Sequence, residues 1–308
     1  MISALDERAV SIAAGLRGNL LHPYNRRHRV SAVARYLEWQ VRHRLGRPWT
    51  RRFWRDRDVT LFPDSSESKW LLYNVIMDWP EFPFLEAYLR PDDTVVDVGA
   101  NIGIYTLWIS RFLDERGQLI AFEPSSESFR RLSRQVAQNA LARVVLERKA
   151  VAQASGRLML TTGMDMENRV VDAAAPATAT ATEAVEAVTL DDYLRAHAIT
   201  VVHFLKVDVE GAEPLVLDGA DATLRARRIA VMQLEVGDHW RRYGRDVAST
   251  TERLRQYGYT PFVPDDEGRR VAAAGDWSAA VRGQNLLLTR SLAEVEARLA
   301  AGVAAAHS

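Results

Sequence analysis

Residues 94–103 of this 308-residue chain read TVVDVGANIG. The apolar run at 94–98 predicts a buried β-strand, and the glycines at positions 99 and 103 allow the backbone to turn tightly directly after it. Apolar residues at 103–115 then recur with helical spacing. A strand, a glycine-containing turn and a helix in direct succession are typical of the first unit of a parallel α/β sheet.

The same alternation of strand and helix continues toward the C-terminus. Helical patterns lie at about 126–139, from about 210 to 224 and at 249–257. The alternation predicts a doubly wound α/β fold with helices on both faces of the sheet. The closing strands lack a clear crossover helix, which leaves a hairpin-like ending open. The further strands are predicted at 119–122, 144–151, 201–209, 229–236, 259–263 and 286–289.

The polar residues at the carboxyl ends of the strands are the candidates for a site, because ligands of open α/β sheets bind there. The first strand ends with Asp97, and the turn after it places Asn101 between Gly99 and Gly103. The second strand ends at Glu123, 26 residues after Asp97. The two oxygens of a glutamate at this position can accept hydrogen bonds from two ribose hydroxyls.

The glycine pattern differs from that of nicotinamide dehydrogenases. Their phosphate-binding turn needs three glycines spaced G-x-G-x-x-G, and position 101 of this chain is Asn. Asp97 would also repel phosphates, whereas a carboxylate pairs well with an ammonium group. The pattern therefore favours a ligand that carries an amine and a ribose, such as S-adenosylmethionine.

Further motifs extend this pattern along the chain. Together they resemble the FkbM family of S-adenosylmethionine-dependent methyltransferases, from about residue 95 to 236 and more weakly to 290. Residues 1–57 and the Ala/Thr-rich stretch 173–187 lie outside the resemblance. The motifs are VVDVGANIG at 95–103, FEP at 122–124, VTLDDYL at 188–194, KVDVEGAE at 206–213 and LEV at 234–236.

The resemblance implies a Rossmann-like, seven-stranded class I methyltransferase sheet and O-methylation of a hydroxyl, commonly on a sugar, glycolipid or secondary metabolite. It also implies roles for residues that match the motifs. The acceptor and the transferred methyl group would face Asp208, Glu210 and Glu235, with Asp208 also touching the cofactor. The other cofactor residues would be Asp97, Gly99, Asn101 and Gly103 for the methionine part, Glu123 for the ribose, and Ser125 and Ala150 by their positions at strand ends.

An aliphatic hydroxyl is a poor nucleophile, and a positioned general base adds a factor of ~10²–10⁴ in rate. The candidates for this base are Asp208, Glu235 and His239, which follows Glu235 by four residues. Each has a structural alternative: a helix-capping acid, a partner of a buried cation and a solvated loop histidine. Lys206 lies two residues before Asp208 and on the same face of the strand, so an ion pair between them would weaken Asp208 as a base.

We expect no bound metal. The alternative is a divalent cation such as Mg²⁺ held by Asp208 and Glu235, with waters and acceptor oxygens completing its shell. His203 lies in the middle of a predicted strand and is expected to be a hydrogen-bonded core histidine rather than a catalyst.

The net charge of zero hides an asymmetry. The first 57 residues contain 13 arginines and four acidic residues, a net charge of +9, and the remainder carries −9. Apolar positions at 30–45 have helical spacing. We therefore expect a basic helical extension at 1–57 that serves as an acceptor lid, an oligomer contact or a membrane-surface contact. The other expected parts are a connecting region at 58–93, the methyltransferase domain at 94–290 with a mobile loop at 173–187, and an Ala-rich helix or tail at 291–308.

Several classes of protein are excluded by composition. Without cysteine, the chain has no disulfide, zinc–thiolate site, iron–sulfur cluster or thiol nucleophile. No secretory signal or uncharged run of the ~20 residues needed to span a membrane is recognisable. No nucleic-acid motif accompanies the arginines. We expect a cytoplasmic protein, peripheral to the inner membrane face if the basic extension binds lipid.

The leading functional hypothesis is an O-methyltransferase that uses S-adenosylmethionine on a carbohydrate or glycosylated metabolite. The alternatives are methylation of a non-sugar natural product, a nicotinamide dehydrogenase on the same sheet, and a cofactor-binding scaffold without catalysis. The expected partners are a small-molecule or glycan acceptor and further copies of this chain, which would form a homo-oligomer through the N-terminal helices.

Overall fold

The structure is a computed structural model that describes residues 17–54, 56–163, 170–171, 181–275, 277 and 284–306. The chain divides into two compact units, Met1–Phe82 and Pro83–Ser308. Each unit is described separately below. No helix among the described residues is both long enough and apolar enough to cross a membrane.

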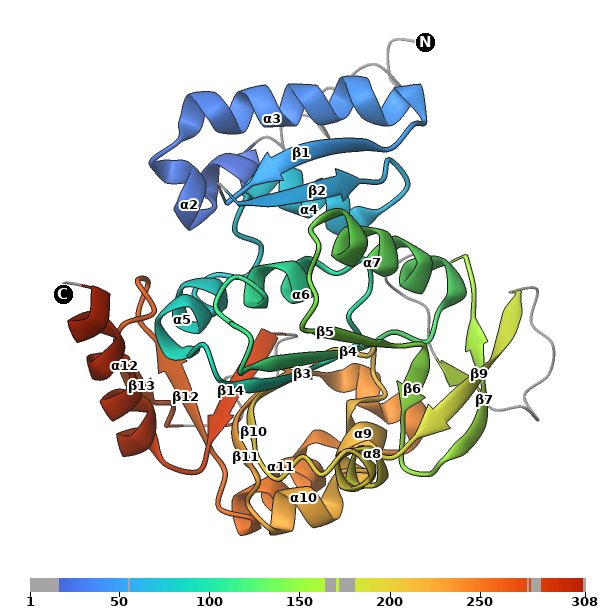
Figure 1. Ribbon diagram of the computed structural model, residues 1–308, viewed down its shortest axis with the longest axis vertical. Coiled ribbons are helices and arrows are strands. Elements are labelled where there is room, and N and C mark those ends of the chain that lie inside the picture. The colour runs from blue at the N-terminus through green and yellow to red at the C-terminus, as the bar shows by residue number, and fades with distance from the viewer. Residues whose placement is uncertain are drawn as a thin grey trace. The chain divides into compact units, whose positions relative to one another are not determined.

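The larger unit is built on one eight-stranded sheet (Figure 1). Five neighbouring strands are parallel, in the order β5-β4-β3-β10-β11. Next to them β14 runs antiparallel to β11, and β12 and β13 complete the edge in antiparallel pairs. The strands are β3 (Thr94–Val98), β4 (Gln118–Phe122), β5 (Val144–Glu147), β10 (Val202–Val207), β11 (Ile229–Val236), β12 (Thr260–Pro264), β13 (Val271–Ala273) and β14 (Gln284–Thr289).

The strand order identifies the fold. The first strand, β3, lies in the middle, successive crossovers extend the sheet to either side, and the last strand enters antiparallel between its neighbours. This is the Rossmann-like arrangement of class I methyltransferases, so the predicted fold class is confirmed, with β13 as an additional edge strand. The predicted hairpin-like ending corresponds to the antiparallel pairing of β12 with β14.

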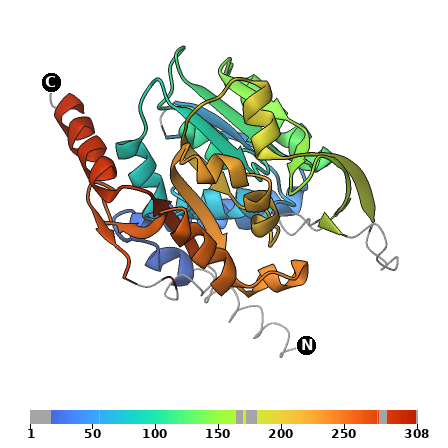
Figure 2. The same ribbon diagram turned by 90° about the horizontal axis from the view of Figure 1, so that it is seen from below.

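Helices cover both faces of this sheet (Figure 1). Figure 1 shows α6 and α7 on one side of the sheet and α8 to α11 on the other, and Figure 2 gives the view from below. The helices are α5 (Glu81–Tyr88), α6 (Ile104–Ile109), α7 (Ser126–Gln138), α8 (Leu190–Ala196), α9 (Glu213–Asp218), α10 (Asp221–Arg225), α11 (Val247–Gln256) and α12 (Leu292–Ala306), with the 3₁₀-helix η3 at Asp238–Tyr243.

The central strands are apolar on both faces because helices cover both faces. In β3 the consecutive residues Val95 and Val96 are both fully buried, and so are Phe204 and Leu205 in β10. Burial of an apolar side chain of this size stabilises the fold by about 1.5–3 kcal/mol. The loops that carry the polar site residues follow directly on these buried strands, which fix where the loops begin.

Two predicted helices are shorter in the structure. The helix expected at 103–115 ends at Ile109. The helix expected to reach residue 224 is divided into α9 and α10 at Gly219. A Cβ atom at position 219 would lie 2.0 Å from the carbonyl oxygen of Ala152, so the chain passes too close here for any other residue.

A second, four-stranded sheet was not predicted. The strand expected at 144–151 is two strands, of which β5 belongs to the main sheet and β6 to the second sheet. The second sheet has the order β6-β9-β7-β8, with β7 antiparallel to both β9 and β8. Its strands are β6 (Lys149–Val151), β7 (Gly156–Thr161), β8 (Val170–Val171) and β9 (Thr182–Val188).

The prediction of a loop at 173–187 is wrong for its C-terminal part. Thr182–Val188 is the strand β9, in which Val185 and Ala187 are buried with Leu160 of β7. Alternate residues of β9 therefore contribute to a small core, which stabilises the strand despite its weak sequence pattern. Residues 173–180 lie outside the described residues.

The smaller unit combines helices with a strand pair (Figure 1). The predicted helix at 30–45 is confirmed by α3 and the short 3₁₀-helix η1 after it. The strand β1 was not predicted, and it pairs with β2 in antiparallel fashion. Arg35 of α3 is buried and donates hydrogen bonds to Asn25 Oδ1 and the Tyr73 carbonyl oxygen. The elements are α2 (Pro23–Arg26), α3 (Arg29–Arg42), η1 (His43–Leu45), β1 (Trp49–Phe53), β2 (Arg57–Leu61) and α4 (Ser66–Asn74).

Candidate active site

The glycine turn after β3 brings the ends of two strands together. Gly99 has φ of +81°, and a Cβ atom at this position would lie 1.8 Å from the carbonyl oxygen of Asp208. The Asp208 N–H donates to the Val98 carbonyl oxygen at 3.1 Å. At Gly103, with φ of +96°, a Cβ atom would lie 2.6 Å from Leu132 Cδ1 of α7. One glycine therefore permits the approach of β10, and the other the packing of α7.

Glu123 joins the turn after β3 to the turn after β4. Its Oε2 accepts a hydrogen bond from the Asn101 N–H at 2.9 Å, and its Oε1 accepts one from the Ser125 N–H at 2.8 Å. Burial of this carboxyl group raises the pKa of Glu123 to about 7, although both hydrogen bonds favour the ionised form. Glu123 is thus a buried, oriented carboxylate at the end of its strand.

The two cofactor candidates chosen for their positions at strand ends, Ser125 and Ala150, have different surroundings. Ser125 is the N-cap of α7, and its side chain accepts a hydrogen bond from the Ser128 N–H. Ala150 lies in β6, where it packs with Leu160 and Val185 in the core of the second sheet. The structure therefore brings Ser125 together with Glu123, whereas Ala150 contributes to a neighbouring apolar cluster.

Lys206 lies between two carboxylates. Its Nζ is 3.0 Å from Asp208 Oδ2 and 3.7 Å from Asp97 Oδ1, and it lies 4.7 Å from the centre of the Tyr105 ring. The predicted ion pair between Lys206 and Asp208 is therefore confirmed. The ammonium group compensates two acids at once, and only 4% of its side chain is exposed.

Asp97 is fully buried beneath this ion pair. Thr106 donates a hydrogen bond to Asp97 Oδ2 at 2.8 Å, while Oδ1 has no hydrogen-bond partner among the described residues. Burial raises the pKa of Asp97, and Lys206 offsets part of this effect. Gln233 of β11 donates a hydrogen bond to the Tyr105 hydroxyl at 2.7 Å. Sequence reasoning missed Thr106, Tyr105 and Gln233, because their positions follow only from the packing of α6 on the strands.

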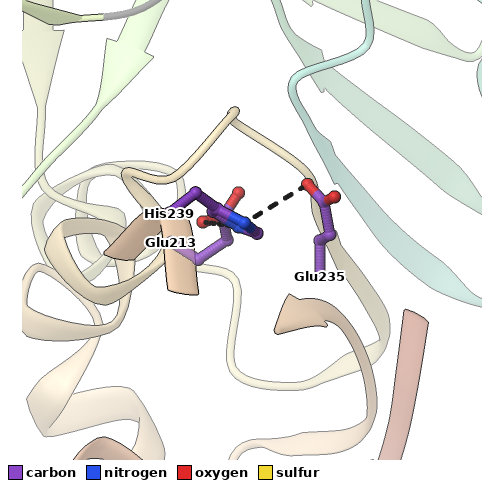
Figure 3. Close-up of side chains that lie close together, drawn as sticks. All are labelled: Glu213, Glu235 and His239. Carbon is purple, nitrogen blue, oxygen red and sulfur yellow. Dashed lines mark ion pairs between the residues drawn. The ribbon is translucent and has the colours of Figure 1, made fainter. Parts of the chain in front are cut away.

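A second acidic group lies at the ends of β10 and β11. Val207 is paired with Leu234 in the parallel register, so Asp208 and Glu235 follow directly at neighbouring strand ends. His239 Nε2 lies 4.0 Å from Glu235 Oε2 and 3.6 Å from Glu213 Oε2. Figure 3 shows the imidazole ring between the two carboxyl groups.

Glu213 is the most buried member of this group, with none of its side chain exposed. Its Oε1 accepts hydrogen bonds from the Val209 N–H at 2.9 Å and the Gly211 N–H at 3.2 Å. Sequence reasoning quoted Glu213 within its motif but gave it no role, and the structure places it in the first turn of α9. The turn with Glu210 at φ of +56° and Gly211 at φ of +105° leads directly to it.

The charges of this group act on one another. Burial raises the pKa of Glu235 to about 7, and the neighbouring Asp208 and Glu213 contribute to the shift. The Glu213 carboxylate raises the pKa of His239, and Glu235 and Glu210 act in the same direction. The group therefore attracts positive charge.

His203 lies apart from these groups at the start of β10. Its Nδ1 accepts a hydrogen bond from the Thr94 N–H at 3.0 Å and lies 3.6 Å from Asp93 Oδ1. The predicted hydrogen bond of His203 is confirmed, but its predicted place in the core is wrong, because it lies at the start of the strand and 30% of its side chain is exposed.

Comparison with known proteins connects this site to a family. The family model described as the methyltransferase FkbM domain matches residues 97–261, more than half of the chain. The chain belongs to the FkbM methyltransferase family. This FkbM domain contains all the candidate site residues from Asp97 to His239. No curated protein matches the chain.

Solved structures similar to the FkbM domain are distant in sequence. An FkbM methyltransferase from Methylobacillus flagellatus is 15% identical, with a TM-score of 0.42, over 66% of this chain and 47% of that one. A putative rRNA-methylase from Clostridium thermocellum is 12% identical, with a TM-score of 0.39, over 68% and 92%. A putative O-methyltransferase from Klebsiella pneumoniae is 13% identical, with a TM-score of 0.36, over 68% and 79%. The match spans about half the length of the Methylobacillus protein.

Proposed function

We propose that the protein is an S-adenosylmethionine-dependent O-methyltransferase whose acceptor is a hydroxyl of a sugar, glycolipid or glycosylated secondary metabolite. The observation that carries the proposal is the placement of two pairs of carboxylates at adjoining strand ends. Asp97 and Glu123 suit a cationic nucleoside donor, and Asp208 and Glu235 suit an acceptor that must lose a proton.

The residues present fit this cofactor. S-adenosylmethionine contains a ribose diol, an ammonium and a sulfonium, and when bound it supplies a methyl group whose S–C bond breaks as the bond to the acceptor oxygen forms. Glu123 is fixed by two backbone N–H groups and retains lone pairs for hydroxyl donors. The raised pKa values of Asp97 and Glu123 indicate carboxyl groups that positive charge would stabilise.

The acidic groups favour an oxygen acceptor over an amine. A neutral amine attacks without a base, whereas a hydroxyl must transfer its proton during the reaction. We choose Asp208 for this role because its side chain is 38% exposed and Lys206 fixes its orientation at 3.0 Å, even though an ion pair weakens a carboxylate as a base. Glu235 and His239 are held together with Glu213, and we assign them, with Glu210, to the binding of the acceptor. Orientation of the reactants can lower the barrier by about 7–11 kcal/mol.

Binding and transfer test this proposal separately. Calorimetry with S-adenosylhomocysteine should show binding to the full chain that Asp97→Ala and Glu123→Ala abolish. Mass spectrometry of glycans and glycolipids from the native host should show a methyl group that is missing when the protein is absent. The proposal fails if the intact protein does not bind the nucleoside, or if the missing methyl group is on nitrogen or carbon.

A further inference from the structure

We propose that Glu213, Glu235 and His239 form a site for a divalent cation. This inference rests on the proposed function for its role, since the cation would hold the acceptor hydroxyl. One ligand atom from each residue lies within 4.8 Å of the other two (Figure 3). The set differs from the Asp208 and Glu235 pair considered from the sequence, because Glu213 and His239 replace Asp208.

Two buried atoms of this group lack hydrogen bonds. Glu213 Oε2 and His239 Nε2 are both without a hydrogen-bond partner among the described residues. Their separation of 3.6 Å is longer than the usual 2.7–3.2 Å of an N–H···O hydrogen bond. A buried polar atom without a hydrogen bond destabilises the folded protein, so a ligand bound between these two atoms would remove that cost.

The separations suit a cation with small adjustments. Bonds of about 2.1 Å place adjacent ligand atoms roughly 3.0–3.4 Å apart, in octahedral or tetrahedral geometry. The distances from His239 Nε2 are 3.6 Å to Glu213 Oε2 and 4.0 Å to Glu235 Oε2. Both are longer than this range, the second by roughly 0.6–1 Å, so Glu235 would have to move toward the ion. Glu213 is already oriented by two backbone N–H groups, which leaves Oε2 as its free ligand atom.

The donor set selects the class of cation. Two carboxylates and one imidazole suit Mn²⁺, Fe²⁺ or Zn²⁺ better than Mg²⁺ or Ca²⁺, which prefer oxygen ligands alone. Three protein ligands leave coordination positions for other molecules, as in catalytic metal sites. A bound hydroxyl is more acidic than a free one, so Asp208 at the adjoining strand end could remove its proton more easily.

Gly211 makes room for the histidine ligand. A Cβ atom on residue 211 would lie 3.2 Å from the His239 carbonyl oxygen and 3.3 Å from its Cδ2 atom. The 3₁₀-helix η3 can therefore approach the turn before α9 closely enough to bring His239 beside Glu213.

The same geometry has a competing explanation without a metal. In that case His239 is protonated and forms ion pairs with both carboxylates.

The experiment measures metal binding without methyl transfer. The full chain is freed of metal with a chelator and titrated with Mn²⁺, with free Mn²⁺ followed by electron paramagnetic resonance, and then with Zn²⁺ in calorimetry. We expect one ion per chain. Glu213→Gln, Glu235→Gln and His239→Gln should each weaken binding at least ~10-fold, a loss typical even of residues that only orient a metal ligand.

Asp238→Asn is the matched control, because Asp238 carries the same charge in the same segment and its side chain is 73% exposed. Circular dichroism checks that each variant is folded, and Glu235→Gln is the informative variant if Glu213→Gln does not fold. The proposal is overturned if no ion binds, or if the ligand variants bind as the control does. Calorimetry with S-adenosylhomocysteine on the same samples shows separately whether the proposed function holds.

A second observation concerns the outer face of α3 and stands independently. Val30, Leu37, Val41 and Leu45 are 86%, 58%, 62% and 66% exposed, at spacings of seven, four and four residues. They form one stripe, while Ala32, Tyr36 and Trp39 on the other face are buried. Exposed arginines accompany the stripe: Arg26, Arg27, Arg29, Arg42, Arg44 and Arg47.

We infer that this stripe binds an anionic membrane surface. An apolar stripe flanked by arginines is typical of helices that lie in the lipid headgroup region. Basic residues near an anionic surface strengthen membrane binding, and the effect is screened by salt. Glu38 is the one acidic residue between positions 26 and 47, so the charge of this segment favours an anionic surface.

Sedimentation with vesicles tests this inference. The full chain should bind vesicles of phosphatidylcholine mixed with phosphatidylglycerol, but not phosphatidylcholine alone, and high salt should release it. Leu37→Ser with Val41→Ser should weaken binding about tenfold. Val201→Ser with Val263→Ser is the control, since these two are exposed elsewhere. Equal binding of both variants, or a dimer in solution that only the α3 variant disrupts, overturns the inference.

Discussion

The carbonyl oxygen of Asp208 lies 1.8 Å from the position that a Cβ atom on Gly99 would occupy. The end of β10 therefore passes directly against the turn after β3, and the two motifs that carry the site depend on one another. Gly99 also has φ of +81°, where residues other than glycine are strained. Glycine is needed here for the approach of the protein's own backbone as well as for the turn.

Gly99→Ala should lower the free energy of unfolding by about 2–5 kcal/mol, since it adds a backbone collision to left-handed strain. Denaturant unfolding measures the loss. Gly244→Ala is the control, because Gly244 has φ of +66° but no atom within 4 Å of an added Cβ. It should cost only about 1–2 kcal/mol. If both variants lose the same free energy of unfolding, the collision with the Asp208 carbonyl oxygen does not contribute.

The parallel sheet could be predicted because its signals are local. The strands β3, β10 and β11 are apolar runs followed by helical spacing, and their burial on both faces follows from that pattern. The second sheet could not be predicted in the same way. In β9 the buried residues are Val185 and Ala187, and their burial depends on Leu160, which is distant in the sequence.

The site could be predicted only in part for a similar reason. Asp97, Glu123, Asp208 and Glu235 are recognisable because strand ends converge at one edge of a parallel sheet. Glu213 lies in a helix, where its position gives no indication that it is fully buried beside His239. Its role depends on how η3 returns to the turn before α9, which is a tertiary contact.

Lys206→Met should lower the free energy of unfolding by about 3–5 kcal/mol, because it leaves buried Asp97 without its cation. The double variant with Asp97→Asn should recover part of this loss. A double-mutant cycle, which compares the unchanged protein, the two single variants and the double variant, measures the coupling between the two residues. Lys149→Met is the control, since Lys149 pairs with Glu147 in a more exposed setting and should cost about 1 kcal/mol or less. Additive losses for Lys206 and Asp97 would contradict the prediction.

The stability of the unliganded protein should fall as the pH rises from 4.5 to 7, in part because of Glu123. The pKa of Glu123 is about 7 in the folded protein, whereas its ordinary value, which applies to the unfolded chain, is 4.5. As the pH rises, the unfolded chain therefore releases this proton at a lower pH than the folded protein does. The stabilisation present below pH 4.5 is lost through this interval, by at most ~3.5 kcal/mol at about 1.4 kcal/mol per pH unit.

Glu123→Gln removes the titrating group, so the difference in unfolding free energy between the two proteins should change across the same interval. Urea unfolding at several pH values measures it. A difference that stays constant with pH would show that the Glu123 carboxyl titrates normally.

Asp208→Asn should lower kcat of methyl transfer by a factor of ~10²–10⁴, because the amide cannot take the acceptor proton. The affinity for S-adenosylhomocysteine should fall far less than kcat even if Asp208 touches the cofactor, since Asp97 and Glu123 remain and Lys206 keeps Asp97 as its partner. Asp238→Asn is the matched control on the exposed surface, and its kcat should equal that of the unchanged protein. Steady-state kinetics with labelled methyl donor and calorimetry on the same preparations separate the two effects. An Asp208→Asn protein with full kcat would assign the base to Glu235 or His239 instead.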